Sequence, residues 1–426
     1  MSETFSTPAV ILEGSPRGNL GIVRTLGRLG VPVYVIDSKP GSPASRSRYC
    51  KEVFHWDFAA ARADETVSFL TSIGTMIGRR SFLFPTCDEN AILAAKHFET
   101  LKKWFVYPEQ SSALASSLVS KKEMYFLAKQ HGVPTPEASF PESIDDVLRF
   151  CETAKFPLMA KGIDGARLKR LVGAGVIIAE NRSDLLDVYK RLDESERSNV
   201  MLQEYIPGGD DSIWMFNGYF DGDSNCLFGI TGKKIRQYPP YTGQTSLGIC
   251  LRNDFVYETT VRWMKELGYK GILDIGYRFD ARDGQYKVLD VNPRIGATFR
   301  LFVDQNGMDV ARAFYLDLTR RQVPRAVARE GRKWVVEDCD IGSCLRYRKD
   351  GKLTLAGWLK SLRGVEEAAY FALGDLGPFF HMCMSSFLTV FRMERQLPVQ
   401  LKDFRTSNES QALRGASKAS PACNAG

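Results

Sequence analysis

The chain has 426 residues, 44% of them hydrophobic, and a formal net charge of +7. This length allows a large buried core and favours two or three domains, and the mild positive charge favours small anionic ligands over nucleic acid, which needs a dense basic stripe. Nine cysteines without a repeated short spacing and four scattered histidines argue against a disulfide framework and a zinc site, and predict reduced thiols in the cytoplasm. We expect no signal peptide and no transmembrane segment.

The first segment predicts a β-α-β unit. Residues 9–12 form a short apolar run, a glycine-rich stretch leads into a helical pattern, and VPVYVID at residues 31–37 is a second strand. The spacing of Gly14, Gly18 and Gly21 is not G-x-G-x-x-G. Two interpretations remain open, a weak dinucleotide site with Asp37 at the ribose, or a tight turn into a helix.

A third strand is expected at residues 82–84, followed by PTCDEN. Polar groups at the carboxyl end of a parallel strand lie where ligands bind in open α/β sheets. Asp88 and Glu89 are therefore candidate substrate contacts, and the alternative is that they cap the next helix.

SKKEMYFLAKQHGVPTPE, residues 120–137, predicts an amphipathic helix that ends near Gly132 and Pro134. PLMAKG, residues 157–162, is a strand that ends in Lys161, and an unpaired ammonium is costly to bury. The glycine-rich segment that follows, residues 162–175, also contains cations and suits a loop that covers phosphates. Its cations are Arg167, Lys169 and Arg170.

Two further strands are expected on either side of residue 220. VMLQEYIPGGDDSIW, residues 200–214, is an apolar strand with a Gly-Gly turn, and GITGKKIRQYPPYTGQTSLG begins at residue 229. Lys234 and Arg236 lie two apart, so we expect them on one strand face, with Lys233 as their neighbour. They face either an anionic ligand or solvent. Residues 238–246 are a candidate wall on the substrate side.

GILDIGYRFDARDGQYKVLDVNPRIGATFR, residues 271–300, predicts a β-hairpin with its turn at residues 283–284. Asp290 and Asn292 share a face, and pairing of the strands would set Asp274 opposite them. Three oxygen ligands of this kind suit Mg²⁺, and Arg294 follows as a fixed cation. The alternative is an ordinary exposed hairpin with solvated acids.

LDVNPR resembles the E-x-N-P-R metal motif of the ATP-grasp fold, and the segments above match this family in order. Over residues 8–318 the chain resembles ATP-grasp carboxylate–amine ligases, including the D-aspartate-ligase-like group. The resemblance implies an α/β (α+β) ATP-grasp fold with an N-terminal pre-ATP-grasp domain at 1–115 and an ATP-grasp domain at 116–318. A mostly helical region at 319–403 and a disordered tail at 404–426 would complete the chain.

The resemblance assigns roles residue by residue. The metal ligands would be Asp274, Asp290 and Asn292, which would bind Mg²⁺ (two ions, with Mn²⁺ as an alternative). The catalytic cations would be Arg294, Lys234 and Arg236. ATP would contact Lys121, Lys161, Gln203, Glu204, Tyr205, Ile206 and Asp211.

Three positions depart from the family pattern. Asp290 replaces the usual Glu, Ser120 replaces the usual Asp, and Gly276 stands where a Glu often supplies a metal ligand, with Asp274 as the natural substitute.

The resemblance implies an ATP-dependent ligase that joins a small-molecule carboxylate to an amine through an acyl phosphate. We expect no nucleic-acid partner, and a homodimer is common for this fold. Two alternatives are a non-catalytic ATP-binding regulatory protein and a membrane-surface or scaffold protein that uses the aromatic C-terminal region, residues 368–403.

Overall fold

The computed structural model describes residues 5–13, 16–38, 41–163, 176–190 and 199–395, with side chains to residue 387. The chain divides into two compact units, Met1–Phe379 and Phe380–Gly426. The four-part division expected from the sequence stays a prediction, and its tail at 404–426 lies outside the described residues.

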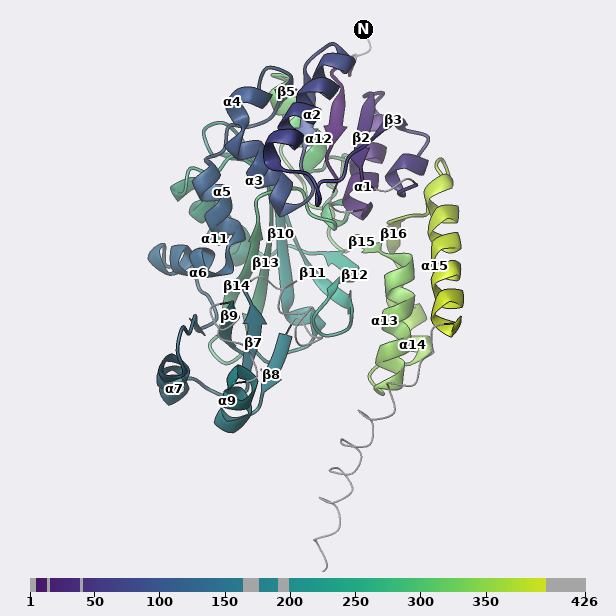
Figure 1. Ribbon diagram of the computed structural model, residues 1–426. Coiled ribbons are helices and arrows are strands. Elements are labelled where there is room, and N and C mark those ends of the chain that lie inside the picture. The colour runs from purple at the N-terminus through teal and green to yellow at the C-terminus, as the bar shows by residue number, and fades with distance from the viewer. Residues whose placement is uncertain (1–4, 14–15, 39–40, 164–175, 191–198, 396–426) are drawn as a thin grey trace, which may run out of the picture. The chain divides into compact units, whose positions relative to one another are not determined.

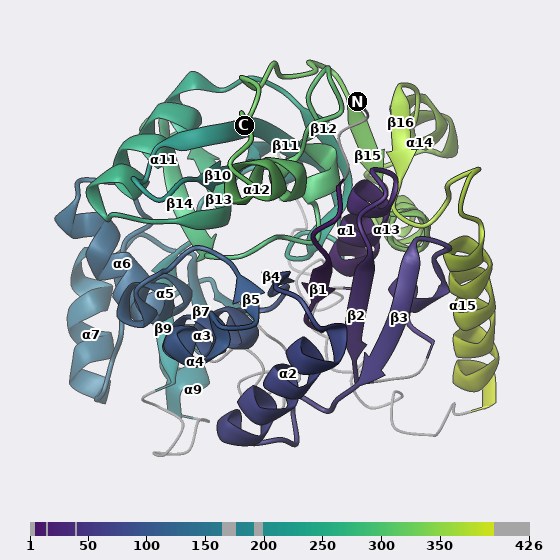
Figure 2. The same cartoon turned by 90° about the horizontal axis from the view of Figure 1, so that it is seen from above.

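The first sheet is parallel and has the strand order β3-β2-β1-β4-β5. Figure 2 shows β1, β2 and β3 side by side. The predicted β-α-β unit is confirmed, because α1 joins two parallel neighbours, β1 and β2. The strands of the first sheet and the helices between them are β1 Ala9–Ile11, α1 Pro16–Gly27, β2 Val33–Asp37, η1 Ala44–Arg46, β3 Cys50–His55, α2 Ala63–Ile77, β4 Ser81–Phe84, α3 Asp88–Lys96, α4 Phe98–Leu101 and β5 Phe105–Val106.

Burial explains why these short strands form. All residues of β1, β2 and β4 are buried, which is typical of parallel strands covered on both faces. Val10, Ile36 and Leu83 from the strands pack with Leu70 and Ile73 of α2 in one core.

A four-stranded sheet with the order β6-β9-β7-β8 follows in the chain. All its pairings are antiparallel, and α7 and α9 pack against it. Two helices, α5 Ser112–Val119 and α6 Lys121–Gln130, precede it, and the Ser120 side chain caps α6 by accepting from the Glu123 N–H. The elements of this part are β6 Ala138–Ser139, α7 Ile144–Thr153, β7 Leu158–Gly162, β8 Val176–Ala179, α9 Arg182–Lys190 and β9 Val200–Glu204.

The third sheet has seven strands in the order β14-β13-β10-β11-β12-β15-β16 (Figure 1). Every pairing is antiparallel except that of β15 with β16. Its elements and the helices between them are η2 Asp210–Ser212, β10 Ile213–Phe220, β11 Cys226–Tyr238, β12 Gln244–Cys250, α11 Asp254–Glu266, β13 Gly271–Asp280, β14 Gln285–Asn292, η3 Phe299–Leu301 and α12 Val310–Leu318.

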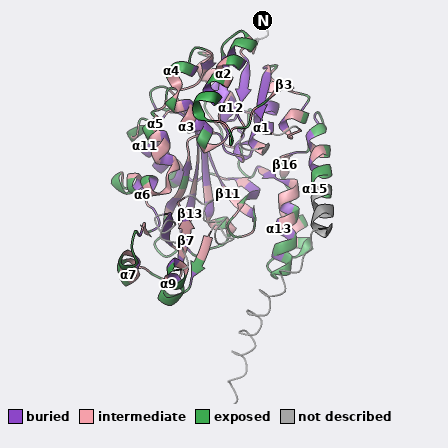
Figure 3. Cartoon of the chain, viewed as in Figure 1, coloured by how far each residue is buried: buried purple, intermediate pink, exposed green. Residues whose placement is uncertain are grey.

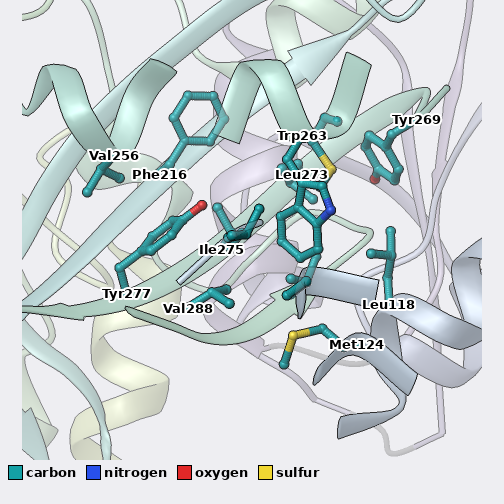
Figure 4. Packing of buried hydrophobic residues seen from close by; sticks show 14 of the residues in the cluster. Leu118, Met124, Phe216, Val256, Trp263, Tyr269, Leu273, Ile275, Tyr277 and Val288 are labelled. Carbon is teal, nitrogen blue, oxygen red and sulfur yellow. The ribbon is translucent and has the colours of Figure 1, made fainter. Parts of the chain in front are cut away.

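The core of this sheet forms on the face that α11 covers. Trp263 of α11 meets Tyr277 of β13 and Val288 of β14, and Leu118 and Met124 close the same cluster from α5 and α6 (Figure 4). Buried residues follow the strands, whereas exposed residues mark the outward faces of α6 and α9 (Figure 3). The sheet thus gives a rigid base for the side chains on its other face.

The hairpin prediction is confirmed. β13 and β14 pair antiparallel around a turn at residues 281–284, where Gly284 has a φ of 73° that favours glycine. Asp274 lies opposite Asn292, and Gly276 lies opposite Asp290.

The region after residue 319 is less helical than expected. β15 Lys333–Val335 and β16 Val365–Ala368 are the last two strands at one edge of the seven-stranded sheet. α13 Glu337–Lys349 and α14 Leu355–Ser361 lie between them in the chain. These strands have only three and four residues, so periodicity could not separate them from the surrounding helical pattern.

A last helix, α15 Gly377–Arg395, lies within the region 319–403 that was expected to be mostly helical. Within the part of the chain that the structure describes, no helix combines the length and the apolar character that a membrane crossing requires.

Candidate active site

A cleft of about 1460 Å³ lies within the first unit. Strand residues of the four-stranded and seven-stranded sheets line it, together with segments that follow β1 and β4 of the first sheet. Every residue to which the family resemblance assigned ATP, metal or a catalytic charge lines this cleft except Gln203, together with others that the sequence did not indicate. Asp37 and Lys233, two further ligand candidates, do not line it. The lining residues that bear on its chemistry are Arg17, Thr86, Cys87, Asp88, Glu89, Lys121, Lys161, Glu204, Tyr205, Ile206, Asp210, Asp211, Lys234, Arg236, Gln237, Gln244, Asp274, Gly276, Arg278, Asp290, Asn292, Arg294, Tyr347 and Lys352.

Two lysines define one wall. Lys121 opens α6, and its Nζ donates to the Gly162 carbonyl oxygen at 2.9 Å. Lys161, on β7, donates to Gln203 Oε1 at 2.6 Å, and within the described ranges no carboxylate forms an ion pair with it. Burial, reinforced by the charge of Lys121, lowers the pKa of Lys161 to about 8. A neighbouring anion such as a phosphate would offset the free-energy cost of burying the ammonium, so this wall suits the phosphates of a nucleoside triphosphate.

The last two residues of β9, Gln203 and Glu204, differ in their relation to the cleft. Gln203 is buried and acts as the partner of Lys161, and it is not part of the cleft lining. The Glu204 carboxylate accepts from Arg282 at 2.6 Å and lies 3.4 Å from Lys287 Nζ, so its charge is already compensated.

Tyr205, Ile206 and Asp211 line the cleft beyond this strand. Asp211 is exposed within η2. The prediction that ATP contacts Glu204, Tyr205 and Ile206, with Asp211 or Asp210 near the ribose or the substrate, stays a prediction.

The candidate metal ligands lie together on the β13–β14 hairpin. Asn292 Nδ2 donates to Asp290 Oδ2 at 3.2 Å and to the Asp274 carbonyl oxygen at 3.2 Å. Burial and the neighbouring Asp290 raise the pKa of Asp274 to about 6, against the opposing charges of Arg294 and Lys234. A cation beside these carboxylates would relieve that cost.

Two glycines make room for the carboxylates. A Cβ at Gly296 would lie 2.0 Å from Asp274 Oδ2, and a Cβ at Gly276 would lie 2.6 Å from Asp290 Oδ1. The Asp290 carboxylate therefore occupies the space in which a glutamate at position 276 would begin. The departure from the family pattern at Gly276 is sterically linked to the position of Asp290.

The donor set fits one Mg²⁺, which is commonly held by one or two carboxylates and keeps several waters. Asp274 and Asp290 supply the carboxylates, and the Asn292 amide oxygen already accepts from Arg294 Nη2 at 3.0 Å. No group of three or more His, Cys, Asp or Glu residues suited to a metal occurs in the described ranges. A second ion stays a prediction.

Arg294 joins the hairpin to the first sheet. Its Nε donates to Asp88 Oδ1 at 2.7 Å, and Asp88 follows β4 at the start of α3. The capping alternative is wrong for this residue, because Cys87 is the N-cap of α3 and Asp88 uses its side chain to bind Arg294. Arg294 is thus held in a fixed position at the edge of the cleft.

Lys234 and Arg236 diverge although the sequence placed them on one face. The β11–β12 ladder shifts register between them, so strict alternation does not hold there. Lys234 Nζ donates to the Gly243 carbonyl oxygen at 2.8 Å, and burial lowers its pKa. Arg236 instead forms a two-bond ion pair with Asp340 of α13 at 2.9 and 2.8 Å, which favours a role in holding α13 against β11.

The loop at residues 239–243 borders the cleft, in agreement with the position expected for residues 238–246. The expected glycine-rich loop at 162–175, with Arg167, Lys169 and Arg170, lies outside the described residues beyond Ile163.

Several lining residues were not predicted. Arg278 is four residues after Asp274 on the same strand, so the period of two could have found it, and its Nη2 donates to the Gly208 carbonyl oxygen at 2.7 Å. Arg17 and Tyr347 come from segments far from the motifs. Tyr347 donates to Asp210, a contact that no local pattern signals.

Known proteins share sequence with about half of this chain. No family model matches it. The D-aspartate ligase of Enterococcus faecium (strain Aus0004) is 24% identical over 247 residues, which cover 55% of this chain and 58% of that ligase. The chain therefore spans little more than half the length of this curated relative.

Solved structures share the fold. The biotin carboxylase domain of Hydrogenobacter thermophilus 2-oxoglutarate carboxylase, a dimer crystallised with MgADP and bicarbonate, has a TM-score of 0.58 and 17% identity over 76% of this chain and 73% of that chain. The L-amino acid ligase of Bacillus licheniformis has a TM-score of 0.54 and 15% identity, over 74% of this chain and 75% of that chain.

The architecture is therefore the ATP-grasp fold, a mixed α/β fold with an N-terminal parallel sheet followed by antiparallel sheets. The chain therefore has the fold of the ATP-grasp superfamily and is similar in sequence, over about half its length, to a D-aspartate ligase.

Proposed function

We propose that this chain is an ATP-dependent ligase that joins a carboxylate to an amine and releases ADP and phosphate. The observation that carries the proposal is the content of one cleft: Lys121 and Lys161 on one wall, and Asp274, Asp290 and Arg294 on the β13–β14 side. Phosphoryl transfer needs positioning and charge stabilisation more than side-chain nucleophiles, and this set supplies both.

The residues have distinct tasks in this reaction. Lys121 and Lys161 would bind phosphate oxygens of ATP and hold the γ-phosphate in line with the carboxylate substrate. Asp274, Asp290 and the Asn292 amide oxygen would hold Mg²⁺, which would neutralise negative charge on the phosphates of ATP. Mn²⁺ would suit the same oxygen donors.

Two bonds are exchanged in sequence. A carboxylate oxygen attacks the γ-phosphorus and ADP leaves, which gives an acyl phosphate. The neutral amine then attacks the acyl carbon, phosphate leaves, and the amine loses a proton. Arg294, whose Nε donates to Asp88, would stabilise negative charge on the acyl group in both steps.

The alternative function is that of a non-catalytic ATP-binding regulatory protein. It is favoured by Gly276, which stands where the family often has a Glu as metal ligand, and by the absence of a metal-binding group of three His, Cys, Asp or Glu residues in the described part of the chain. A substrate-dependent turnover assay separates the two functions, because a regulatory protein would bind ATP without consuming it in step with a substrate.

The homodimer expected from the fold also stays a prediction.

The test is ADP formation from Mg-ATP with pairs drawn from amino acids and small carboxylates, for the wild type and two variants. Asp290→Asn removes one carboxylate charge at the candidate metal site. Asp283→Asn makes the same change in the turn of the same hairpin, outside the cleft. We expect substrate-dependent ADP release that Asp290→Asn reduces by about 10³-fold and Asp283→Asn leaves nearly unchanged. ATP binding without substrate-dependent ADP release for any pair would favour the regulatory protein.

A further inference from the structure

The first sheet contains a topological switch point next to the cleft. Its order reverses between β1 and β4, because the chain continues from β1 to β2 and β3 on one side and from β4 to β5 on the other. Ligands of open parallel sheets bind outside the carboxyl ends of the strands at such a point. Arg17, which follows β1, and Thr86 to Glu89, which follow β4, line the cleft there.

Arg17 is a cation whose side-chain partners are neutral. Its Nη2 donates to Gln244 Oε1 at 3.3 Å, and its Nη1 lies 3.5 Å from Cys339 Sγ. Burial raises the pKa of Cys339 to about 11, so this sulfur is a neutral thiol near pH 7. Within the described ranges, no Asp or Glu oxygen forms an ion pair with Arg17, whereas the cleft-lining Arg236 and Arg294 have such partners.

The acids around Arg17 are engaged elsewhere or turned to solvent. Asp88 binds Arg294 at 2.7 Å, and Asp338 accepts from the Cys339 N–H at 2.8 Å. Glu89 is exposed at the start of α3. The guanidinium therefore faces the cleft without a compensating carboxylate from the described chain.

A second cation, Lys234, contacts the chain next to Gln244, the first residue of β12. Lys234 donates to the carbonyl oxygen of Gly243, the residue before Gln244, which is the partner of Arg17. Gly243 has no room for a side chain, since a Cβ would lie 2.0 Å from the Tyr238 carbonyl carbon. The tight turn at Gly243 thus lets the two cations contact adjacent residues of the chain, Lys234 at Gly243 and Arg17 at Gln244.

We propose that Arg17 binds a carboxylate of the substrate at this switch point, so that the molecule admitted there carries an anionic group besides the group that reacts. The inference rests on the proposed ligase function and narrows its substrate to acidic compounds, such as amino dicarboxylic acids. A planar guanidinium suits this task because it can bind a carboxylate through two parallel hydrogen bonds.

The experiment measures binding by calorimetry, without nucleotide and with Mg-ADP, so that no turnover is needed. The ligands are aspartate and asparagine, and glutamate and glutamine, in both enantiomers, because each pair differs by one carboxylate. The proteins are the wild type, Arg17→Met, Arg17→Lys, and Arg28→Met as the matched control. Arg28 is exposed directly after the other end of the same helix and does not line the cleft.

We expect the wild type to bind at least one acid more tightly than its amide by roughly 10- to 100-fold, as a charge-assisted hydrogen bond provides. Arg17→Met should remove this preference, Arg17→Lys should retain part of it, and Arg28→Met should behave as the wild type. Equal binding of acid and amide by the wild type, or an unchanged preference in Arg17→Met, would overturn the proposal. A wild type that shows the Arg17-dependent preference but forms no ADP would count against the ligase function alone.

Discussion

Lys161 and Arg236 are two cations with different surroundings in the same cleft. Lys161 lies near the end of a strand with Gln203 as its hydrogen-bond partner, and burial lowers its pKa to about 8. Arg236 is buried, and both oxygens of Asp340 compensate its charge.

The difference separates a binding role from a structural one. A buried ion pair with good geometry connects elements, as Arg236 connects β11 to α13 and as Arg24 of α1 connects to Asp375. A desolvated cation with a neutral partner lowers the stability of the fold and is retained where a ligand supplies the opposite charge. We therefore propose that Lys161 binds ATP and that Arg236 stabilises the fold.

The largest effect is expected from breaking the compensated pair. Arg236→Met leaves Asp340 buried with only Trp358 and Ser246 as donors, and should lower the free energy of unfolding by about 3–5 kcal/mol. Chemical denaturation would measure this loss. The double variant Arg236→Met/Asp340→Leu should recover a large part of it, and equal stability of the single variant and the wild type would show that the pair does not hold α13.

Removal of the Lys161 charge, which no carboxylate of the described chain compensates, should weaken the binding of ATP. Lys161→Met keeps the length of the side chain and should weaken ATP binding by about 10²- to 10³-fold, with the free energy of unfolding within about 1 kcal/mol of the wild type. Titration with Mg-ATP and denaturation of the same sample measure both quantities. A variant that unfolds easily yet binds ATP normally would reverse the assignment.

Local patterns predicted one half of this site and missed the other. The period of two along β13 and β14 placed Asp274, Asp290 and Asn292 together, because neighbours in a hairpin are set by the strand register. The divergence of Lys234 from Arg236 depends on a β-bulge, and the pairing of Arg236 with Asp340 joins residues 104 positions apart. Such contacts follow from the packing of α13, which no short segment encodes.

The same limit applies to the fold. The long, regular patterns of α6 and the hairpin were predicted correctly, and the family resemblance supplied the overall architecture. The short strands β15 and β16 were missed, since three or four residues carry too little periodicity.

Because the pKa of Lys161 is lowered to about 8, we expect ATP use by the enzyme to depend on pH. The ammonium is present below about pH 8 and is lost as the pH rises through that value. We expect kcat/KM for ATP to fall by about tenfold per pH unit above pH 8. Lys161→Arg should move this fall to higher pH, and an unchanged profile in this variant would exclude Lys161 as its source.

The smallest effect concerns the space beside Asp290. Gly276→Ala would place a Cβ 2.6 Å from Asp290 Oδ1, so the carboxylate must shift by a fraction of an ångström. We expect turnover to fall by about tenfold with little change in ATP binding through Lys161. Gly222→Ala is the matched control, because a Cβ added at Gly222 would have no neighbouring atom within 4 Å. Equal turnover of the two variants would show that the space beside Asp290 does not matter for the reaction.

The most direct test of the ligase proposal is to trap the activated carboxylate with hydroxylamine in place of the amine substrate. We predict a hydroxamate that requires ATP, Mg²⁺ and the carboxylate, forms in step with ADP, and disappears in Asp290→Asn. ADP formation that depends on the carboxylate but yields no hydroxamate would contradict an acyl phosphate, and with it the proposed reaction.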